Sequence, residues 1–202
     1  MSNDAKILEL MEVADVSAGY PLRSSAEALD KGGVHFIQLK HVDTEAELDW
    51  ACVPTVALPS KRDPQWLTDD DVIFAARGTR TFAYPLMNTP DHTVCAPQFF
   101  VLSAADKGRV LPGFLAWQIN QRPAQEYLAQ RSTGAHIPNV RRRALEEMPI
   151  IVPSLAQQEV IVELWRAARE ERATLTRLME NRTQQMEALA LGLFQNAQRA
   201  RP

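Results

Sequence analysis

The first three quarters of the chain consist of short apolar runs separated by polar turns. Runs rich in β-branched and aromatic residues predict strands within residues 34–42, 71–84 and 93–103. The second run is interrupted by Arg77-Gly78-Thr79-Arg80, and this break predicts a hairpin with an arginine on either side of its tip.

Residues 110–130 have a helical pattern. Pro112 suits the entry to a helix, and Pro123 is predicted to divide the segment into two helices. Strands and helices follow one another without regular βαβ alternation. The pattern therefore predicts an α+β domain over residues 1–152, with small mixed sheets.

Residues 153–202 have a different pattern. Ser154 and Gln157 fit a capping box, and from there to Phe194 the chain contains no proline and only one glycine, Gly192. Apolar residues recur at spacings near three and four, which predicts about 40 residues of helix, or ~60 Å. The expected contact positions are Ile161, Leu164, Ala168, Leu175, Leu178, Met186 and Leu189.

A small domain cannot bury a helix of this length, so the apolar stripe is expected to need a partner helix. A helix that folds back over its own domain is the alternative. In the first case residues 153–202 form a dimerisation and spacer helix; in the second they belong to the domain.

Charge is unevenly distributed along a chain whose net charge is only −3. The first 60 residues hold four basic and ten acidic residues, whereas residues 72–145 hold nine basic and three acidic ones. This asymmetry predicts a positive face formed by the middle of the chain.

The densest positive charge is Arg141-Arg142-Arg143, at the expected start of a short helix entered through Pro138-Asn139. Cations are unfavourable at a helix N-terminus by a few tenths of a kcal/mol each, because that end already carries partial positive charge. An external anion such as phosphate would offset the cost, and the loop of residues 131–136 adds hydroxyl groups and a glycine. A solvated arginine face paired with local glutamates is the alternative.

Other residue types favour a reduced protein without a metal site. Cys52 and Cys95 are too few for a disulfide scaffold, and the four histidines have no metal-ligand spacing with each other or with the cysteines. Asp69-Asp70-Asp71 is interpreted as a solvated turn before a strand. The sequence lacks a signal-peptide pattern and a long apolar run, so a soluble, cytoplasmic protein is expected.

Several stretches, in order, resemble one half of the specificity (S) subunit of type I restriction-modification systems. They are VADVSAGYPLR (13–23), GGVHFIQLKHV (32–42), LTDDDVIFAARGT (67–79) and STGAHIPNVRRRALEEMPIIVPSLAQQEVIVEL (132–164). The family usually has two prolines before the leucine and then a Glu-Gln pair. In this chain the corresponding residues are Pro153-Ser154-Leu155 and Gln157-Gln158, and Ser154 and Gln157 still fit the capping box.

The resemblance implies a target recognition domain followed by a long helix that pairs as an antiparallel coiled coil. A full-length member carries two of each; this chain carries one, so two copies would pair, or this chain would pair with a different half subunit. The resemblance also implies no catalytic activity and no cofactor of its own. Methyltransferase subunits, which use S-adenosylmethionine to methylate adenine, and a nuclease-translocase subunit would be the partners on double-stranded DNA.

Candidate DNA contacts come from the basic segment. Arg77 and Arg80 are the first candidates, because arginine binds guanine through two hydrogen bonds, and Thr79 would assist. The further candidates are Arg131, Thr133, His136, Asn139, Arg141 and Arg142, with Gln38 and Lys40 added if the polar side of their strand faces DNA. No residue is expected to be catalytic.

Two other function classes remain open. A coiled-coil adaptor whose globular domain binds protein would suit the acidic first quarter of the chain. An enzyme with an unrecognised site is the third hypothesis, although the sequence contains no GxSxG, HExxH or glycine-rich phosphate loop.

Overall fold

The computed structural model describes residues 5–22, 33–58, 64–104, 108–134 and 138–199. The chain divides into two compact units, residues 1–163 and 164–202. The first contains every strand of the described chain and the first turns of the last helix. The α+β prediction, small mixed sheets followed by a long C-terminal helix, is confirmed.

A four-stranded antiparallel sheet in the order β2-β8-β5-β6 forms the centre of the first unit. Its strands are β2 (Asp15–Ala18), β5 (Asp71–Ala75), β6 (Phe82–Pro85) and β8 (Phe99–Ser103). β5 and β6 are the two strands of the predicted hairpin, and every residue in both is buried. The sheet is therefore covered on both faces in this region.

A second sheet, in the order β4-β3-β7, packs beside the first. β3 (Val34–Ile37) pairs antiparallel with β4 (Thr55–Val56) and parallel with β7 (Thr93–Cys95). Residues of both sheets contribute to one core cluster, which includes Ile37, Ile73, Val94 and Phe99. Two 3-10 turns, η1 (Leu39–His41) and η2 (Trp50–Cys52), lie between β3 and β4.

The predicted strand at residues 34–42 was too long. β3 ends at Ile37, and the backbone N–H of Gln38 donates to Nδ1 of His41, which closes the turn η1. Gln38 and Lys40 thus lie on a turn and not on a strand. Gly32, the first residue of the GGVHFIQLKHV stretch, lies outside the described residues.

Residues 110–130 form two helices, as predicted: α2 (Pro112–Ile119) and α3 (Arg122–Arg131), each with a proline in its first turn. α2 packs on β6 and β5. The side chain of Asn120, which caps α2, accepts from the backbone N–H of Ala83 (2.9 Å) and donates to its carbonyl (2.8 Å). One side chain therefore pairs with both backbone polar groups of Ala83 at the edge of β6, as a further strand would.

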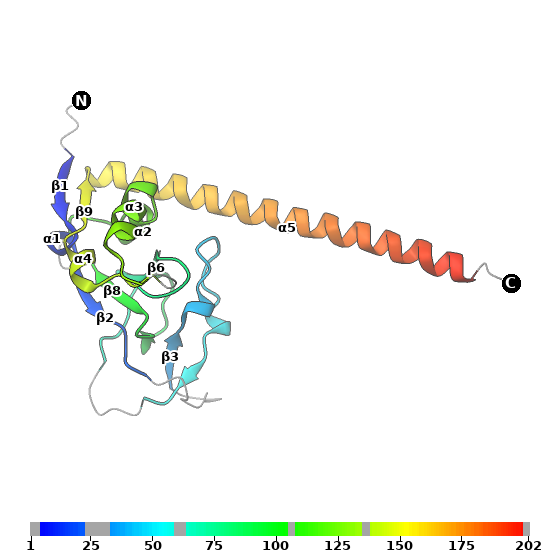
Figure 1. The fold of residues 1–202 in the computed structure, drawn as a ribbon, viewed down its shortest axis with the longest axis horizontal. Coiled ribbons are helices and arrows are strands. Elements are labelled where there is room, and N and C mark those ends of the chain that lie inside the picture. Colours follow the sequence, from blue (N-terminus) through cyan, green and yellow to red (C-terminus); the bar gives the residue numbers. More distant parts are fainter. Residues whose placement is uncertain (1–4, 23–32, 59–63, 105–107, 135–137, 200–202) are drawn as a thin grey trace. The chain divides into compact units, whose positions relative to one another are not determined.

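The two ends of the first unit meet in a small sheet (Figure 1). β1 (Lys6–Glu9) pairs antiparallel with β9 (Pro149–Val152), with Lys6 opposite Val152. α1 (Leu10–Val13) follows β1 directly, and α4 (Arg142–Glu146) precedes β9. β1 is therefore fixed next to the residues that lead into the last helix.

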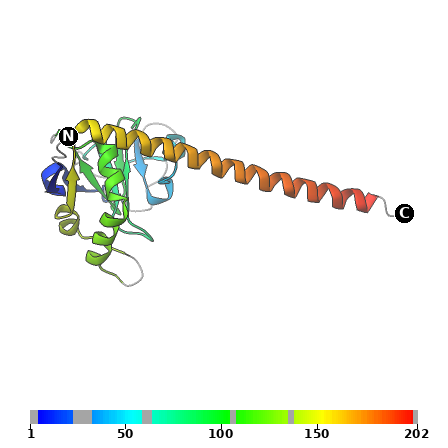
Figure 2. The same cartoon turned by 90° about the horizontal axis from the view of Figure 1, so that it is seen from above.

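α5 (Leu155–Arg199) is a single helix of 45 residues, which corresponds to about 68 Å (Figure 2). The predicted capping box is confirmed, because Ser154 Oγ accepts from the Gln157 backbone N–H (3.4 Å) and Gln157 Oε1 accepts from the Ser154 backbone N–H (3.3 Å). Val162 is buried against α2, where a Cβ added to Gly113 would lie 3.1 Å from a methyl group of Val162.

A fully buried glutamine anchors the first turns of α5. Gln158 Oε1 accepts from the Leu111 N–H (2.9 Å), and Nε2 donates to the carbonyl oxygens of Arg109 (2.9 Å) and Pro153 (3.0 Å). These bonds connect α5 to the segment that enters α2. The polar side chain of Gln158 thus substitutes for backbone pairing at the junction.

In the second unit the predicted contact positions of α5 are exposed. Leu175 and Leu178 are 53% and 54% exposed, and Met186 and Leu189 are both 61% exposed. The pairing of this stripe with another helix stays a prediction. Ile161, at the other end of the stripe, is half-buried within the first unit.

Candidate DNA interface

The tip of the β5–β6 hairpin carries the two first-ranked arginines. Ala75 and Phe82 are the last paired residues, and both strands are anchored in the core below them. Arg77 and Arg80 are exposed at the tip. Because a buried hairpin holds it on both sides, the tip is a rigid platform for exposed side chains.

On one side of the tip, Arg77 contacts Asn139. Arg77 Nε donates to Asn139 Oδ1 over 3.0 Å, and the two residues form a β-bridge. The adjacent Val140 N–H donates to the Ala76 carbonyl over 2.9 Å. Only Nε of the guanidinium is used in the bond to Asn139, so the terminal nitrogens have the geometry to bind a guanine edge or a phosphate.

A third segment joins the same bridge. Thr133 and Asn139 exchange backbone N–H···O bonds, both of 3.0 Å, and the Thr133 hydroxyl lies 3.3 Å from the Asn139 carbonyl. The structure thus brings together three predicted residues, Arg77, Thr133 and Asn139, that are up to 62 positions apart. His136 lies outside the described residues.

This arrangement corrects the predicted helix entry at Pro138-Asn139. Asn139 is in extended, bridged backbone, because its pairing with Arg77 and Thr133 competes successfully with helix formation. α4 begins at Arg142, and Arg141 is its N-cap residue without a side-chain cap.

The arginines of α4 are mostly paired within their own helix. Arg142 Nε lies 2.7 Å from Glu146, and Arg143 Nε lies 2.6 Å from Glu147. These i,i+4 pairs are the local glutamate pairing that the sequence left as the alternative. All three arginines remain exposed, so a phosphate could still approach Arg141 and Arg142.

On the other side of the tip, Arg80 contacts the turn between β3 and β4. Its Nη2 donates to the Thr44 hydroxyl (3.1 Å), and its guanidinium carbon lies 5.5 Å from the Phe82 ring centre. A Cβ placed on Gly78 would lie 3.5 Å from a methyl of Leu39. The tip therefore lies against the turn η1, which carries Gln38 and Lys40. Thr79 is exposed between the two arginines.

A cavity of about 400 Å³ lies beside η1. Its polar lining comes from Gln38, Lys40 and Gln98, and Phe36 is part of its apolar wall. The Gln98 carbonyl accepts from the Ala76 N–H at the base of the hairpin tip. Amide side chains suit the paired donor and acceptor of an adenine edge. Gln98 was not predicted, because it becomes part of the site only through tertiary packing.

Arg131 is held by an aromatic ring. Its guanidinium carbon lies 3.8 Å from the ring centre of Tyr127, one turn earlier in α3. Burial raises the pKa of the Tyr127 hydroxyl, so it stays neutral and the ring keeps its attraction for the cation. Tyr127 was missed, although its i,i+4 spacing from Arg131 could have indicated it. Thr44, which positions Arg80, gave no such signal.

The aspartate run is only in part the solvated turn that the sequence predicted, because Asp71 is buried at the start of β5. Asp71 is buried and accepts from the Thr68 N–H (2.8 Å), the Thr68 hydroxyl and the Ser103 hydroxyl, while Asp69 accepts from the Thr89 N–H. The described residues contain no group of three potential metal ligands. Among them, no helix is both long and apolar enough to cross a membrane.

Three solved structures resemble this chain, all at low sequence identity. They are the S subunit of a type I restriction-modification system from M. genitalium (TM-score 0.59, 14% identity), the HsdS subunit from Thermoanaerobacter tengcongensis (0.60, 18%), and a chain described under the assembly and conformational transition of the type I R-M system (0.63, 16%). Protein-family models and curated proteins give no match.

The matches cover 89%, 88% and 94% of this chain but only 42%, 40% and 44% of the respective structures. The chain thus spans less than half the length of the structures it matches. At the level of the fold, the resemblance to one half of an S subunit is confirmed.

Proposed function

We propose that this chain reads DNA as one recognition half of a specificity subunit in a type I restriction-modification complex. The fold match to S subunits over about nine tenths of the chain carries the proposal. The grouping of predicted DNA contacts around one exposed hairpin tip supports it independently.

The hairpin tip is the proposed base-reading element. Arg77, fixed through Nε by Asn139, offers its terminal nitrogens to a guanine, a contact worth about 1–3 kcal/mol of discrimination. Gln38 and Gln98 beside the adjacent cavity offer amides that suit adenine. Arg80 and Lys40 add positive charge on the same side of the tip.

The arginines around the Thr133–Asn139 bridge are the proposed phosphate contacts. Arg131 precedes the bridge along the chain, and Arg141 and Arg142 follow it. Phosphate contacts fix register and orientation on the duplex but carry no sequence information directly. Exposed arginines on both sides of this bridge are suited to that role.

Catalysis belongs to partner subunits in this proposal. Adenine methylation, with S-adenosylmethionine, would be carried out by methyltransferase subunits in the cytoplasm, and cleavage by a nuclease-translocase subunit. Each half subunit would read one half of a bipartite site. Two identical copies would read an inverted repeat, because a two-fold symmetric protein matches a two-fold symmetric target.

Salt-dependent DNA binding tests the proposal. If Arg131, Arg141 and Arg142 each neutralise one phosphate, the affinity for a fluorescent duplex should fall about 40-fold between 50 and 200 mM salt. Replacing both Arg141 and Arg142 with alanine should weaken binding and reduce the salt slope by about two. Arg122→Ala is the matched control, since Arg122 is exposed and paired with Glu126 on α3.

The two main function classes give different results in this experiment. A folded protein that does not bind DNA at low salt would refute DNA reading and favour the protein-binding adaptor, which the acidic first 60 residues suit. Binding that is equally strong in the Arg141→Ala/Arg142→Ala variant and in the wild type would refute the phosphate role of these two arginines.

A further inference from the structure

The small β1–β9 sheet has one covered edge and one open edge. β1 has a single neighbour, β9, in which Ile151 lies opposite Ile7. The Gln118 side chain occupies both backbone groups of Ile151: Nε2 donates to the Ile151 carbonyl oxygen (2.9 Å), and Oε1 accepts from the Ile151 N–H (2.8 Å). The Gln118 amide therefore covers the outer edge of β9, and both groups of Ile151 point away from β1.

The direction of the Ile151 groups determines the direction of the Ile7 groups. In an antiparallel ladder, two opposite residues either exchange both hydrogen bonds or direct both N–H and C=O away from each other. Ile7 and Ile151 are of the second kind, so the N–H and C=O of Ile7 lie on the outer edge of β1. Neither group has a hydrogen-bond partner among the described residues. Two residues further on, the Glu9 N–H donates to Glu12 Oε2 (2.7 Å), so the edge is closed at Glu9 and open at Ile7.

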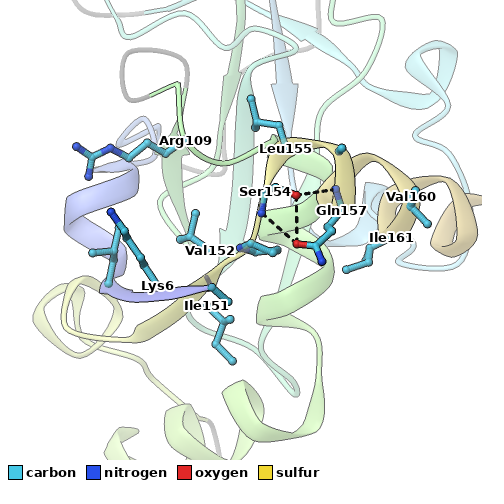
Figure 3. A pocket seen from close by; sticks show the side chains of 13 residues that line it. Lys6, Arg109, Ile151, Val152, Ser154, Leu155, Gln157, Val160 and Ile161 are labelled. Atoms are coloured by element: carbon cyan, nitrogen blue, oxygen red, sulfur yellow. Dashed lines mark hydrogen bonds between the residues drawn. The ribbon is translucent and has the colours of Figure 1, made fainter. Parts of the chain in front are cut away.

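A cavity of about 1270 Å³ borders the same strand. It lies between β1, β9 and the first turns of α5 (Figure 3). Lys6 and Leu8 line it, whereas Ile7 points to the other face of the strand and is 71% exposed. On the helix side, Leu155 and Val160 line the cavity and are 46% and 55% exposed. Exposed apolar side chains that gather around one groove mark an interaction surface.

One side of this cavity is positively charged. Lys6 from β1 and Arg109 from the segment before α2 both line it, and both are exposed. Figure 3 shows them on the side of the cavity away from Val160. Neither forms an ion pair with a carboxylate of the described residues. The cavity therefore favours a ligand that carries a carboxylate beside an apolar group.

The open edge and the cavity together select an extended chain. A strand that pairs with Ile7 would continue the β1–β9 sheet by main-chain hydrogen bonds. Its side chains would alternate between the face of Ile7 and the face of Lys6 and Leu8, so every second side chain is directed to the cavity side. A helix could not use the Ile7 groups in this way, because its own backbone groups are bonded internally.

Charge favours an acidic strand over a second copy of this chain. Edge-to-edge pairing of two β1 strands would bring two Lys6 and two Arg109 side chains into the same region. Like charges placed together oppose association, whereas a carboxylate on the added strand is attracted to both cations.

We propose that the outer edge of β1 and the adjoining cavity bind an extended segment of a partner protein. In this segment apolar residues alternate with other residues, and an aspartate or glutamate reaches Lys6 and Arg109. The inference goes beyond DNA recognition and does not depend on it, because none of the residues assigned to DNA takes part.

Peptide phage display on the whole chain tests the proposal. A library of random peptides supplies the probes, and enriched peptides are synthesised with a fluorescent label for anisotropy titration. We expect alternating apolar residues accompanied by an aspartate or glutamate. Lys6→Glu/Arg109→Glu should weaken binding at least tenfold at low salt, because two attractive contacts become repulsive. Arg122→Glu/Arg177→Glu is the matched control: it changes the net charge equally at exposed positions outside the cavity and should leave binding unchanged.

Backbone methylation of the selected peptide tests strand addition separately. Every second N–H of a strand faces its neighbour, so N-methylation should weaken binding at alternate positions and have little effect at those between. On the protein side, Ile7→Pro removes the N–H at the open edge, where proline is compatible with a strand, and should weaken binding about fivefold. Ile7→Val, which keeps this N–H, is the control and should bind normally. The methylation series uses the wild-type chain, so it does not depend on the folding of any variant.

Each part of the proposal has a result that would overturn it. No enrichment of peptides over the immobilisation surface alone would overturn the binding site. Equal binding to Lys6→Glu/Arg109→Glu would overturn the acidic partner, and methylation effects without alternation would overturn strand addition. A wild-type dimer that Ile7→Pro converts to monomers would assign the edge to a second copy of this chain instead.

Discussion

Gln158→Leu should destabilise the first unit more than any exposed substitution on α5. Leucine preserves most of the side-chain volume but forms none of the three hydrogen bonds of Gln158. The Leu111 N–H and the carbonyl oxygens of Arg109 and Pro153 would lose their partners at a fully buried side chain.

The magnitude follows from these three groups. An unsatisfied buried polar group costs about 1–3 kcal/mol, and the carbonyl oxygens, with two lone pairs each, fall at the low end. We expect a loss of about 3–5 kcal/mol in the free energy of unfolding. For a chain of this size that corresponds to a decrease in Tm of about 10 °C.

Gln157→Leu is the matched control, because it makes the same substitution one residue away at an exposed position. It removes only the hydrogen bonds that Gln157 Oε1 accepts from the backbone N–H and hydroxyl of Ser154, worth about 0.5–1 kcal/mol. Urea unfolding followed by circular dichroism gives both free energies. The reasoning is refuted if Gln158→Leu is no more destabilising than Gln157→Leu in proteins with equal m-values.

Three further predictions concern other parts of the chain. Gly19→Ala should lower the free energy of unfolding by about 2 kcal/mol or more, because the added Cβ would lie 2.2 Å from the Ala96 carbonyl oxygen. This magnitude is similar to that of other steric changes in a protein core. Thermal unfolding indistinguishable from the wild type would contradict this prediction. Burial, with a smaller effect of Lys40, lowers the pKa of His41. The free energy of unfolding should therefore decrease as pH falls from about 6.5 through the folded-state pKa. His41→Gln should remove this part of the pH dependence, and a variant with the same dependence of stability on pH as the wild type would contradict the prediction. Leu175→Asp should give monomers in sedimentation velocity, and persistent dimers would disprove the predicted contact face.

The elements that the sequence predicted correctly depend on local chemistry. The hairpin follows from two β-rich runs around Arg77-Gly78-Thr79-Arg80, and the division at Pro123 follows from the missing N–H of proline. The capping box at Ser154 involves residues three positions apart. Each signal is contained within a few neighbouring residues, so no tertiary information is needed.

What the sequence did not predict depends on pairing between distant segments. The Asn139 bridge replaced a predicted helix start because Arg77 and Thr133 supply its partners from other parts of the chain. β1 forms only through pairing with β9, across nearly 150 positions. The cavity that contains Gln98 forms in the same way, from segments that no periodicity connects.

The most direct test of DNA recognition is modified-base sequencing of DNA from cells that express this chain with a type I methyltransferase subunit that binds it. Cells with the methyltransferase alone are the control. We predict chain-dependent methyladenine at a motif of two half-sites separated by a fixed spacer, and an inverted repeat if two copies pair as proposed. No chain-dependent methylation, with both proteins present and associated, would contradict the assignment as a specificity subunit.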